Sequence, residues 1–293
     1  MRVFVTGASG FIGSAVIPEL LSAGHSVTGL ARSDESAQAI TALGASVHRG
    51  SLDDTASIAA GAAASDAVIH LAFIHDFSKF EENCATDRRT IEALAATLRG
   101  SKRPLIVTGG LAVAAQGRPA IESDPHVPSS IFPRAISEEA TVAAAADGVN
   151  AMTIRLPQVH DRFRQGLITW FIDLALAKGV SAYVGEGTGR FAAAHVSAVA
   201  RLYRLVLEHG VAGKAYHAVA EEGVALRAIA ETIGKRFDLP VRSIEEAKVE
   251  EHFGWMARFS NGITPASSAW TRETLGWNPT GATLLEDLAH ARE

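Results

Sequence analysis

The sequence has 293 residues, which is enough for one large domain or for a large domain with a smaller partner. Its net charge of −5 at pH 7 argues against nucleic acid or an anionic membrane as the main partner, because both are bound by basic surfaces. One cysteine, Cys84, excludes an internal disulfide, and the eleven histidines show no metal-site spacing. With no signal peptide and no membrane-spanning apolar run visible, we expect a cytoplasmic protein.

The first residues predict a strand and then a phosphate-binding turn. Residues 1–6 (MRVFVT) form a β-branched and aromatic run, and glycines at 7, 10 and 13 precede an amphipathic helix that ends near Gly24. The first glycine permits a tight turn, the second lets the backbone approach a pyrophosphate, and the third lets the helix pack close to the sheet. The alternative is a glycine-rich loop without a ligand. The residues expected to contact a dinucleotide are Gly7, Ser9, Gly10, Phe11, Ile12 and Gly13.

The second predicted strand, residues 25–33 (HSVTGLARS), bears on the choice of cofactor. A site that prefers NAD places a carboxylate at the end of this strand to bind the ribose hydroxyls. Here Arg32 and Ser33 occupy that place, and an arginine can pair with a 2′-phosphate. We therefore expect NADP(H) to be preferred over NAD(H). The alternative is that Arg32 is a solvated loop residue, and Asp34 and Glu35 follow it closely.

Strands and helices then alternate, which predicts an α/β fold with a doubly wound parallel sheet of the Rossmann type. Further strands are expected at 45–50, 66–73, 103–110 and 150–157, with a helix at 82–98. Ligands of such sheets lie at the carboxyl ends of the strands. The residues expected along that crevice are Leu52, Leu71, Ala72, Phe73, Thr108, Leu156, Pro157 and Val159.

The later half is less regular. Residues 163–179 predict one or two helices, and 221–239 predict another helix after a turn. The glycines between residues 181 and 196 indicate a turn, because no helix opens directly after them. An apolar and aromatic cluster at 252–259 is expected to pack in the core. Its alternatives are a cap over a substrate pocket and a dimer interface.

Five segments together resemble the extended short-chain dehydrogenase/reductase family, the NAD(P)-dependent epimerase/dehydratase group. They are TGASGFIG (6–13), IHLAF (69–73), TIRLPQVH (153–160), GRFAAAHVSAVA (189–200) and TRETLGWNPT (271–280). The resemblance covers essentially the whole chain and implies dinucleotide binding. It leads us to expect a Rossmann domain at 1–160 plus part of 190–220. A smaller substrate-binding portion is expected at 161–189 and 221–293.

One departure from the family affects catalysis. Members carry a serine or threonine after the fifth strand and a Tyr-x-x-x-Lys on the next helix. The tyrosine acts as general acid or base, while the lysine lowers its pKa and holds the nicotinamide ribose. Between Thr108 and Ala151 this chain has neither a tyrosine nor a lysine. The family's serine site falls near Gly110 or Thr108.

The helix of that motif has two possible registers. The tyrosine site falls at Ser130 or Ile131, and the lysine site falls at Arg134 or Ala135. Arg134 can replace the ribose contact and the charge of the lysine. It cannot relay a proton, because a guanidinium stays protonated.

Other side chains are therefore candidates for the proton transfer. His75 follows the fourth strand and His160 follows the sixth, and histidine is suited to proton transfer near neutral pH. Each of them is alternatively a loop residue without a role. Thr108 can orient a carbonyl. An activated acceptor, such as an iminium, needs less protonation. The catalytic candidates are Thr108, His75, Arg134 and His160, without a metal.

These observations favour an NADP(H)-dependent oxidoreductase that transfers hydride to or from a small carbonyl-type substrate. The alternative is a non-catalytic NADP(H)-binding sensor or interaction protein. A sugar-nucleotide epimerase or dehydratase is the third hypothesis, and the missing tyrosine weakens it. A homodimer is also possible, because family dimers pair the helix after the fourth strand with the helix after the fifth.

Overall fold

Helices and strands alternate along the computed structural model, which describes residues 1–115, 117–263 and 265–291. The strands are β1 (Arg2–Thr6), β2 (Ser26–Ala31), β3 (Ser46–Arg49), β4 (Ala67–His70), β5 (Leu105–Gly110), β6 (Ala151–Leu156), β7 (Gln158–His160), β8 (Ser181–Val184), β9 (Arg190–His195), β10 (Ala215–His217), β11 (Glu221–Ala225) and β12 (Val241–Ile244). The α-helices are α1 (Gly13–Ser22), α2 (Asp34–Ala42), α3 (Thr55–Ala63), α4 (Phe80–Leu98), α5 (Ile136–Ala146), α6 (Ile168–Lys178), α7 (Val196–His209), α8 (Leu226–Phe237), α9 (Val249–Phe253), α10 (Ala269–Leu275) and α11 (Leu284–Leu288). Short 3₁₀ helices are η1 (Phe77–Lys79), η2 (Pro133–Ala135), η3 (Glu246–Lys248) and η4 (Gly254–Phe259).

The central sheet has seven strands in the order β10-β6-β5-β4-β1-β2-β3. All of its strand pairs are parallel, which confirms the predicted fold class. The chain proceeds from β1 to one edge through β2 and β3, and then returns to the other side of β1 with β4. The topological switch therefore lies between β1 and β4, which is where such sheets bind nucleotides.

Helices cover both faces of this sheet. On one face α1 packs against α7, and buried side chains such as Ile17 and Leu202 join a single core cluster. On the other face α3, α4 and α5 pack side by side, with Ile58 and Ile91 fully buried between them and the sheet. Each helix buries one apolar face, as expected for a doubly wound fold.

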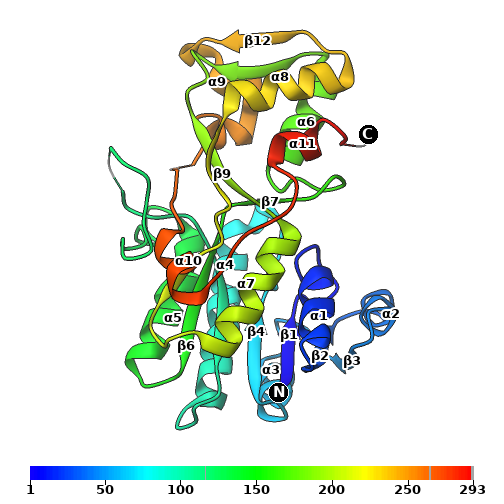
Figure 1. The fold of residues 1–293 in the computed structure, drawn as a ribbon, viewed down its shortest axis with the longest axis vertical. Helices are drawn as coiled ribbons and strands as arrows, with labels where there is room; N and C mark the ends of the chain where they lie inside the picture. Colours follow the sequence, from blue (N-terminus) through cyan, green and yellow to red (C-terminus); the bar gives the residue numbers. More distant parts are fainter. Residues whose placement is uncertain (116, 264, 292–293) are drawn as a thin grey trace.

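A smaller part of the chain lies over the carboxyl ends of the central strands (Figure 1). It contains a three-stranded sheet, β11-β9-β7, a two-stranded pair, β12-β8, and α6, α8, α9 and α11 around their own apolar cluster. The N-terminus lies at the opposite end of the central sheet, so the strands run toward this part (Figure 1). The carboxyl ends of the central strands, where the ligand is expected, thus face the smaller part (Figure 1).

One helix begins later in the structure than the sequence predicts. The sequence predicts a helix over 221–239, but residues 221–225 form β11, which pairs antiparallel with β9, and α8 begins only at Leu226. The 252–259 cluster is divided: Phe253 and Met256 are buried, whereas Trp255 is 44% exposed. Among the described residues, no helix is both long and apolar enough to cross a bilayer.

Candidate functional site

The glycine turn between β1 and α1 forms a close-packed cradle. Gly7 has φ +68°, and a Cβ on it would lie 2.7 Å from the Ala72 nitrogen. A Cβ on Gly13 would lie 2.2 Å from the Gly7 carbonyl oxygen. The N-terminus of α1 has no side-chain cap and no acidic residue in its first turn, so it can accept an anion. These features fit the pyrophosphate of a dinucleotide.

The end of β2 presents basic and hydroxyl groups to solvent. Arg32 and Ser33 are both exposed, and Ser33 caps α2 by accepting a hydrogen bond from the Ser36 nitrogen at 3.2 Å. The carboxylate of Asp34 pairs with Arg49 at 2.5 Å. No carboxylate stands at the strand end itself, so the feature expected of an NAD-preferring site is missing there.

The remaining crevice residues lie beyond or near the carboxyl ends of β3, β4 and β6. Leu71, Ala72 and Phe73 follow β4 and are partly buried, and the Ala72 N–H donates to Thr6 Oγ1 at 3.2 Å. Leu156 and Pro157 are likewise partly buried, whereas Val159 is 6% exposed and belongs to the main core. The carbonyl oxygen of Leu52 accepts a hydrogen bond from the Thr90 hydroxyl at 3.2 Å.

The hydroxyl of Thr108 is engaged inside the fold. It donates to the His70 carbonyl oxygen at 2.7 Å and accepts from the Tyr203 hydroxyl at 2.7 Å. Tyr203 comes from α7 and is fully buried, and this burial raises its pKa well above the usual range. Neither hydroxyl is placed to act on a ligand, so the expected catalytic role of Thr108 finds no support in the geometry.

Arg134, by contrast, reaches the end of β5. Its guanidinium carbon lies 4.3 Å from the centre of the Phe73 ring, and NH2 donates to the Thr108 carbonyl oxygen at 3.1 Å. NH1 donates to Asp87 Oδ2 at 3.0 Å. Ala135 is buried, whereas Arg134 lines the crevice, so the structure favours the register that puts Arg134 at the lysine site. In that register the tyrosine site is Ser130, which is exposed.

His75 lies beside the same group. Its ring contacts Phe73 edge-on, with 5.4 Å between ring centres. Partial burial and the nearby charge of Arg134 lower the pKa of His75 below 6.5, although the residue remains exposed to solvent. The structure therefore brings together three of the four catalytic candidates, His75, Arg134 and Thr108, although Thr108 contributes only its backbone carbonyl to the group.

A shallow hollow opens at the end of β5, and its enclosed space is about 10 Å³, roughly that of one water molecule. Its walls include Gly109 and Gly110, and a Cβ on Gly110 would meet nothing within 4 Å. His126, Phe132 and the Arg134 side chain complete it on other sides. His126 could not be predicted as a wall residue from the sequence, because it lies in the long connection between β5 and α5, and the course of that connection depends on the fold.

A buried ion pair supports this connection. Arg155, on β6, contacts both carboxylate oxygens of Glu138 at 2.6–3.1 Å. It also donates to the carbonyl oxygens of Glu122 and Asp124 at 3.4 and 3.0 Å. Both charged groups are almost fully buried, so the pair fixes the backbone just before His126.

His160 belongs to a different environment. It is fully buried, and its Nδ1 is 2.7 Å from Asp287 Oδ2 on α11. Its Nε2 has no hydrogen-bond partner among the described residues, and the ring lies edge-on to His195. Burial lowers its pKa, and the Asp287 carboxylate opposes this shift only in part. The described contacts tie His160 to the C-terminal segment and not to the hollow.

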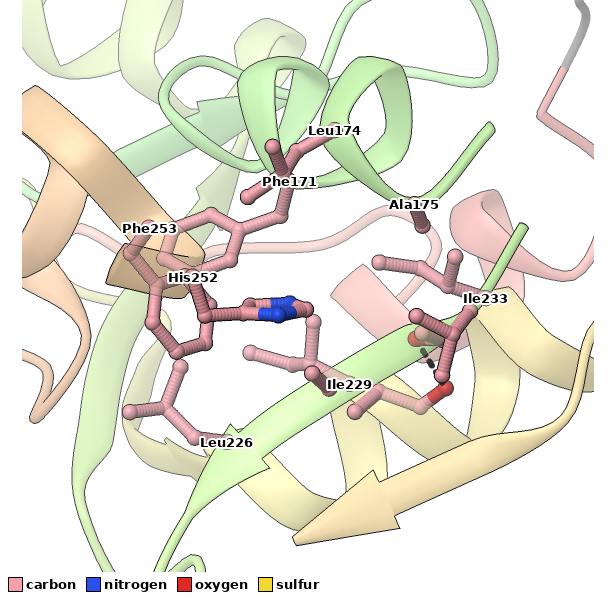
Figure 2. Close-up of a pocket in the computed structure, with 12 residues that line it drawn as sticks. Phe171, Leu174, Ala175, Leu226, Ile229, Ile233, His252 and Phe253 are labelled. Carbon is pink, nitrogen blue, oxygen red and sulfur yellow. Dashed lines mark hydrogen bonds between the residues drawn. The ribbon is translucent and has the colours of Figure 1, made fainter. Parts of the chain in front are cut away.

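A second hollow lies in the smaller part, between α6, α8, α9 and β8, and shares no lining residue with the first. Its walls are mainly apolar, with Phe171, Leu226 and Ile229 among them. The His252 ring points into it (Figure 2). Burial and the charge of Lys178 lower the pKa of His252. We regard this hollow as part of the apolar core, because it lies apart from the glycine turn and the Arg134 group.

Residues 3–219 match the model of the NAD dependent epimerase/dehydratase family. The chain belongs to this family. The match includes the glycine turn, Arg134 and the hollow at β5. Within the described ranges, no three His, Cys, Asp or Glu side chains gather in a way that suits a metal ion.

Proteins at three degrees of sequence identity are similar to this chain. An uncharacterized protein of Schizosaccharomyces pombe is 44% identical over 99% of this chain and 98% of its own. A 4-hydroxy-2-methyl-3-oxo-4-farnesyl-3,4-dihydroquinoline-1-oxide ketoreductase of Stigmatella aurantiaca is 27% identical over 91% of this chain and 84% of its own. The crystal structure of DesIV, a dTDP-glucose 4,6-dehydratase from Streptomyces venezuelae with NAD bound, has a TM-score of 0.78 at 18% identity over 99% and 95% of the two chains. That likeness shows a shared fold.

Proposed function

We propose that the protein is an NADP(H)-dependent oxidoreductase that transfers hydride between the nicotinamide and a small carbonyl-type substrate. The observation that carries the proposal is the position of Arg134. Its guanidinium lies over Phe73 at the carboxyl end of the central sheet, which is also the end where the glycine turn follows β1. Phe73 follows β4, which borders the switch point of the sheet, so Arg134 stands beside the place where such sheets bind nucleotides. The similarity to a ketoreductase supports the same reaction class.

Arg32 supports the preference for NADP(H). Its guanidinium can pair with a 2′-phosphate in a charge-assisted contact, and Ser33 adds a hydroxyl at the same exposed strand end. The nearby Asp34 is paired with Arg49, which reduces its repulsion of a phosphate. Arg164 lies with its guanidinium carbon 5.6 Å from the ring centre of Phe11, so it offers a further cation beside the glycine turn.

The side chains at the nicotinamide end have different proposed roles. The bound nicotinamide supplies the hydride chemistry. Arg134 holds and orients, because a guanidinium keeps its proton. We place the small acceptor beside Gly110, where the hollow opens and a Cβ would meet no atom within 4 Å. His75 is our first candidate for the proton donor, and His126, in the wall of the hollow, is the second.

Calorimetry tests the cofactor assignment. NADPH and NADH are titrated into the wild type and into Arg32→Ala. We expect NADPH to bind more tightly than NADH to the wild type, and this selectivity to collapse in the variant. Equal binding of both nucleotides would contradict the NADP(H) preference. A wild type that binds neither nucleotide would overturn the proposed function.

NADPH oxidation tests the reaction class. It is measured against a panel of aldehydes, ketones and imines, and turnover of any member supports the oxidoreductase. Binding without turnover across the panel favours the second function, a non-catalytic NADP(H) sensor. That alternative rests on Gly109 and Gly110, which bring no hydroxyl to the end of β5. A cytoplasmic location and a dimer through α4 and α5 stay predictions.

A further inference from the structure

A row of buried, hydrogen-bonded side chains runs from β1 to Arg134. Thr6 Oγ1 lies 2.7 Å from His70 Nδ1, and His70 Nε2 lies 3.0 Å from Asp87 Oδ1. The other oxygen of Asp87 pairs with Arg134 NH1 at 3.0 Å. The His70 and Asp87 side chains are each only 1% exposed. Asp87 thus occupies the buried face of α4, where an apolar residue is the usual choice.

The charges in this row are compensated. Burial by itself raises the pKa of Asp87, but the charge of Arg134, the contact with His70 and the hydrogen bonds that Asp87 accepts outweigh this effect and lower it. An ionised Asp87 only accepts hydrogen bonds, so His70 Nε2 must carry a hydrogen. The hydroxyl of Ser137 donates to the same carboxylate oxygen that Arg134 contacts.

Arg134 is consequently held on three sides. Asp87 binds NH1, the Thr108 carbonyl oxygen accepts from NH2, and Phe73 lies against the guanidinium. The side chain is still 15% exposed. Its Nε–H and the second hydrogen of NH2 have no acceptor among the described residues, so two donors remain for a ligand.

We propose that Asp87, fixed by His70, is a positioning residue that presents Arg134 to the nicotinamide ribose. The proposal rests on the NADP(H) binding proposed above. Asp87 holds the guanidinium in place, and the donors of Arg134 that remain can bind the ribose hydroxyls.

Calorimetry can distinguish contacts with the nicotinamide ribose from contacts with the adenosine half of the cofactor. NADPH and adenosine 2′,5′-bisphosphate, which lacks the nicotinamide ribose, are titrated into the wild type, Asp87→Asn, Arg134→Gln and the double variant. We expect each single variant to bind NADPH about tenfold more weakly, the loss of roughly one charge-assisted hydrogen bond, and the bisphosphate within about twofold of the wild type. The double variant should match Arg134→Gln, because Asp87 acts through Arg134.

Asp147→Asn is the matched control, since it breaks an exposed pair with Arg99 that is 2.9 Å long. It should change neither affinity. If Asp87→Asn does not fold, Ser137→Ala removes one hydrogen bond from the same carboxylate and should weaken NADPH binding several-fold, with the bisphosphate again unaffected.

Three results would overturn the inference. The first is an Asp87→Asn variant with a lower unfolding temperature but wild-type affinity for NADPH. The second is an equal fall in the affinities for NADPH and the bisphosphate, which indicates a general loss of structure. The third is a double variant in which the losses of Asp87→Asn and Arg134→Gln add. A wild type that binds the bisphosphate and NADPH normally, with any of these results, leaves the proposed function standing.

Discussion

The buried Arg155–Glu138 pair gives the sharpest prediction for stability. The two side chains are 3% and 6% exposed, and Arg155 also donates to the backbone before His126. The substitution Arg155→Met keeps most of the side-chain volume but leaves the Glu138 carboxylate buried without its partner. Breaking a buried ion pair in this way costs about 3–5 kcal/mol of unfolding free energy, whereas an exposed pair costs about 0–1 kcal/mol. The double variant Arg155→Met/Glu138→Leu removes both charges and should recover much of the loss.

The assay is urea unfolding at pH 7, followed by the fluorescence of the four tryptophans. Arg99→Met is the control, because Arg99 is 64% exposed in its pair with Asp147. A loss below about 1 kcal/mol in Arg155→Met would refute the reasoning, since that value is typical of an exposed pair. So would a double variant that loses the sum of the two single losses. Limited proteolysis should also cut the connection at 111–132 faster in Arg155→Met.

Three further predictions concern the cofactor and the proton. Arg32→Ala should weaken NADPH binding about tenfold and leave NADH within about twofold, measured by calorimetry. The pKa of His75 lies below 6.5, so a reaction that uses protonated His75 slows as pH rises through that pKa, and a kcat profile of His75→Gln should lose this limb. Gly13→Ala places a Cβ 2.2 Å from a backbone oxygen and should lower both stability and NADPH affinity. Gly110→Ala meets no atom within 4 Å, and its thermal unfolding should match the wild type.

The local features of this fold were predictable from the sequence. The glycine turn, the strands up to residue 157 and the exposure of Arg32 all depend on residues close together in the chain. The position of the Thr108 hydroxyl was not predictable, because it depends on Tyr203, 95 residues away. The start of α8 was misplaced because residues 221–225 pair with β9, a contact that a helical pattern does not show.

The row behind Arg134 was missed for a related reason. A histidine in a strand and an aspartate in a helix are ordinary residues when each is considered alone. Asp87 did leave one signal, since it falls on the face of α4 that carries Ile91 and Leu94. A charged residue on a buried face requires a partner, and that requirement points to a cation on a neighbouring element. Arg134 is visible as a candidate cation in the sequence, but its contact with Asp87 is not.

The paired charges around the hollow also lead us to expect a preference between two kinds of acceptor. Arg134 is compensated by Asp87 and Arg155 by Glu138, so neither arginine offers an uncompensated charge to the oxygen of a ketone. An iminium already carries the positive charge that a ketone must gain by protonation, and its reduction needs no acid. We therefore expect NADPH oxidation with a cyclic iminium to be at least about tenfold faster in kcat/KM than with the matched ketone, a difference of roughly 1.4 kcal/mol. The iminium rate should be insensitive to His75→Gln, whereas the ketone rate should fall. Equal rates with both acceptors would contradict this expectation, because the ketone would then react as readily as an acceptor that needs no acid.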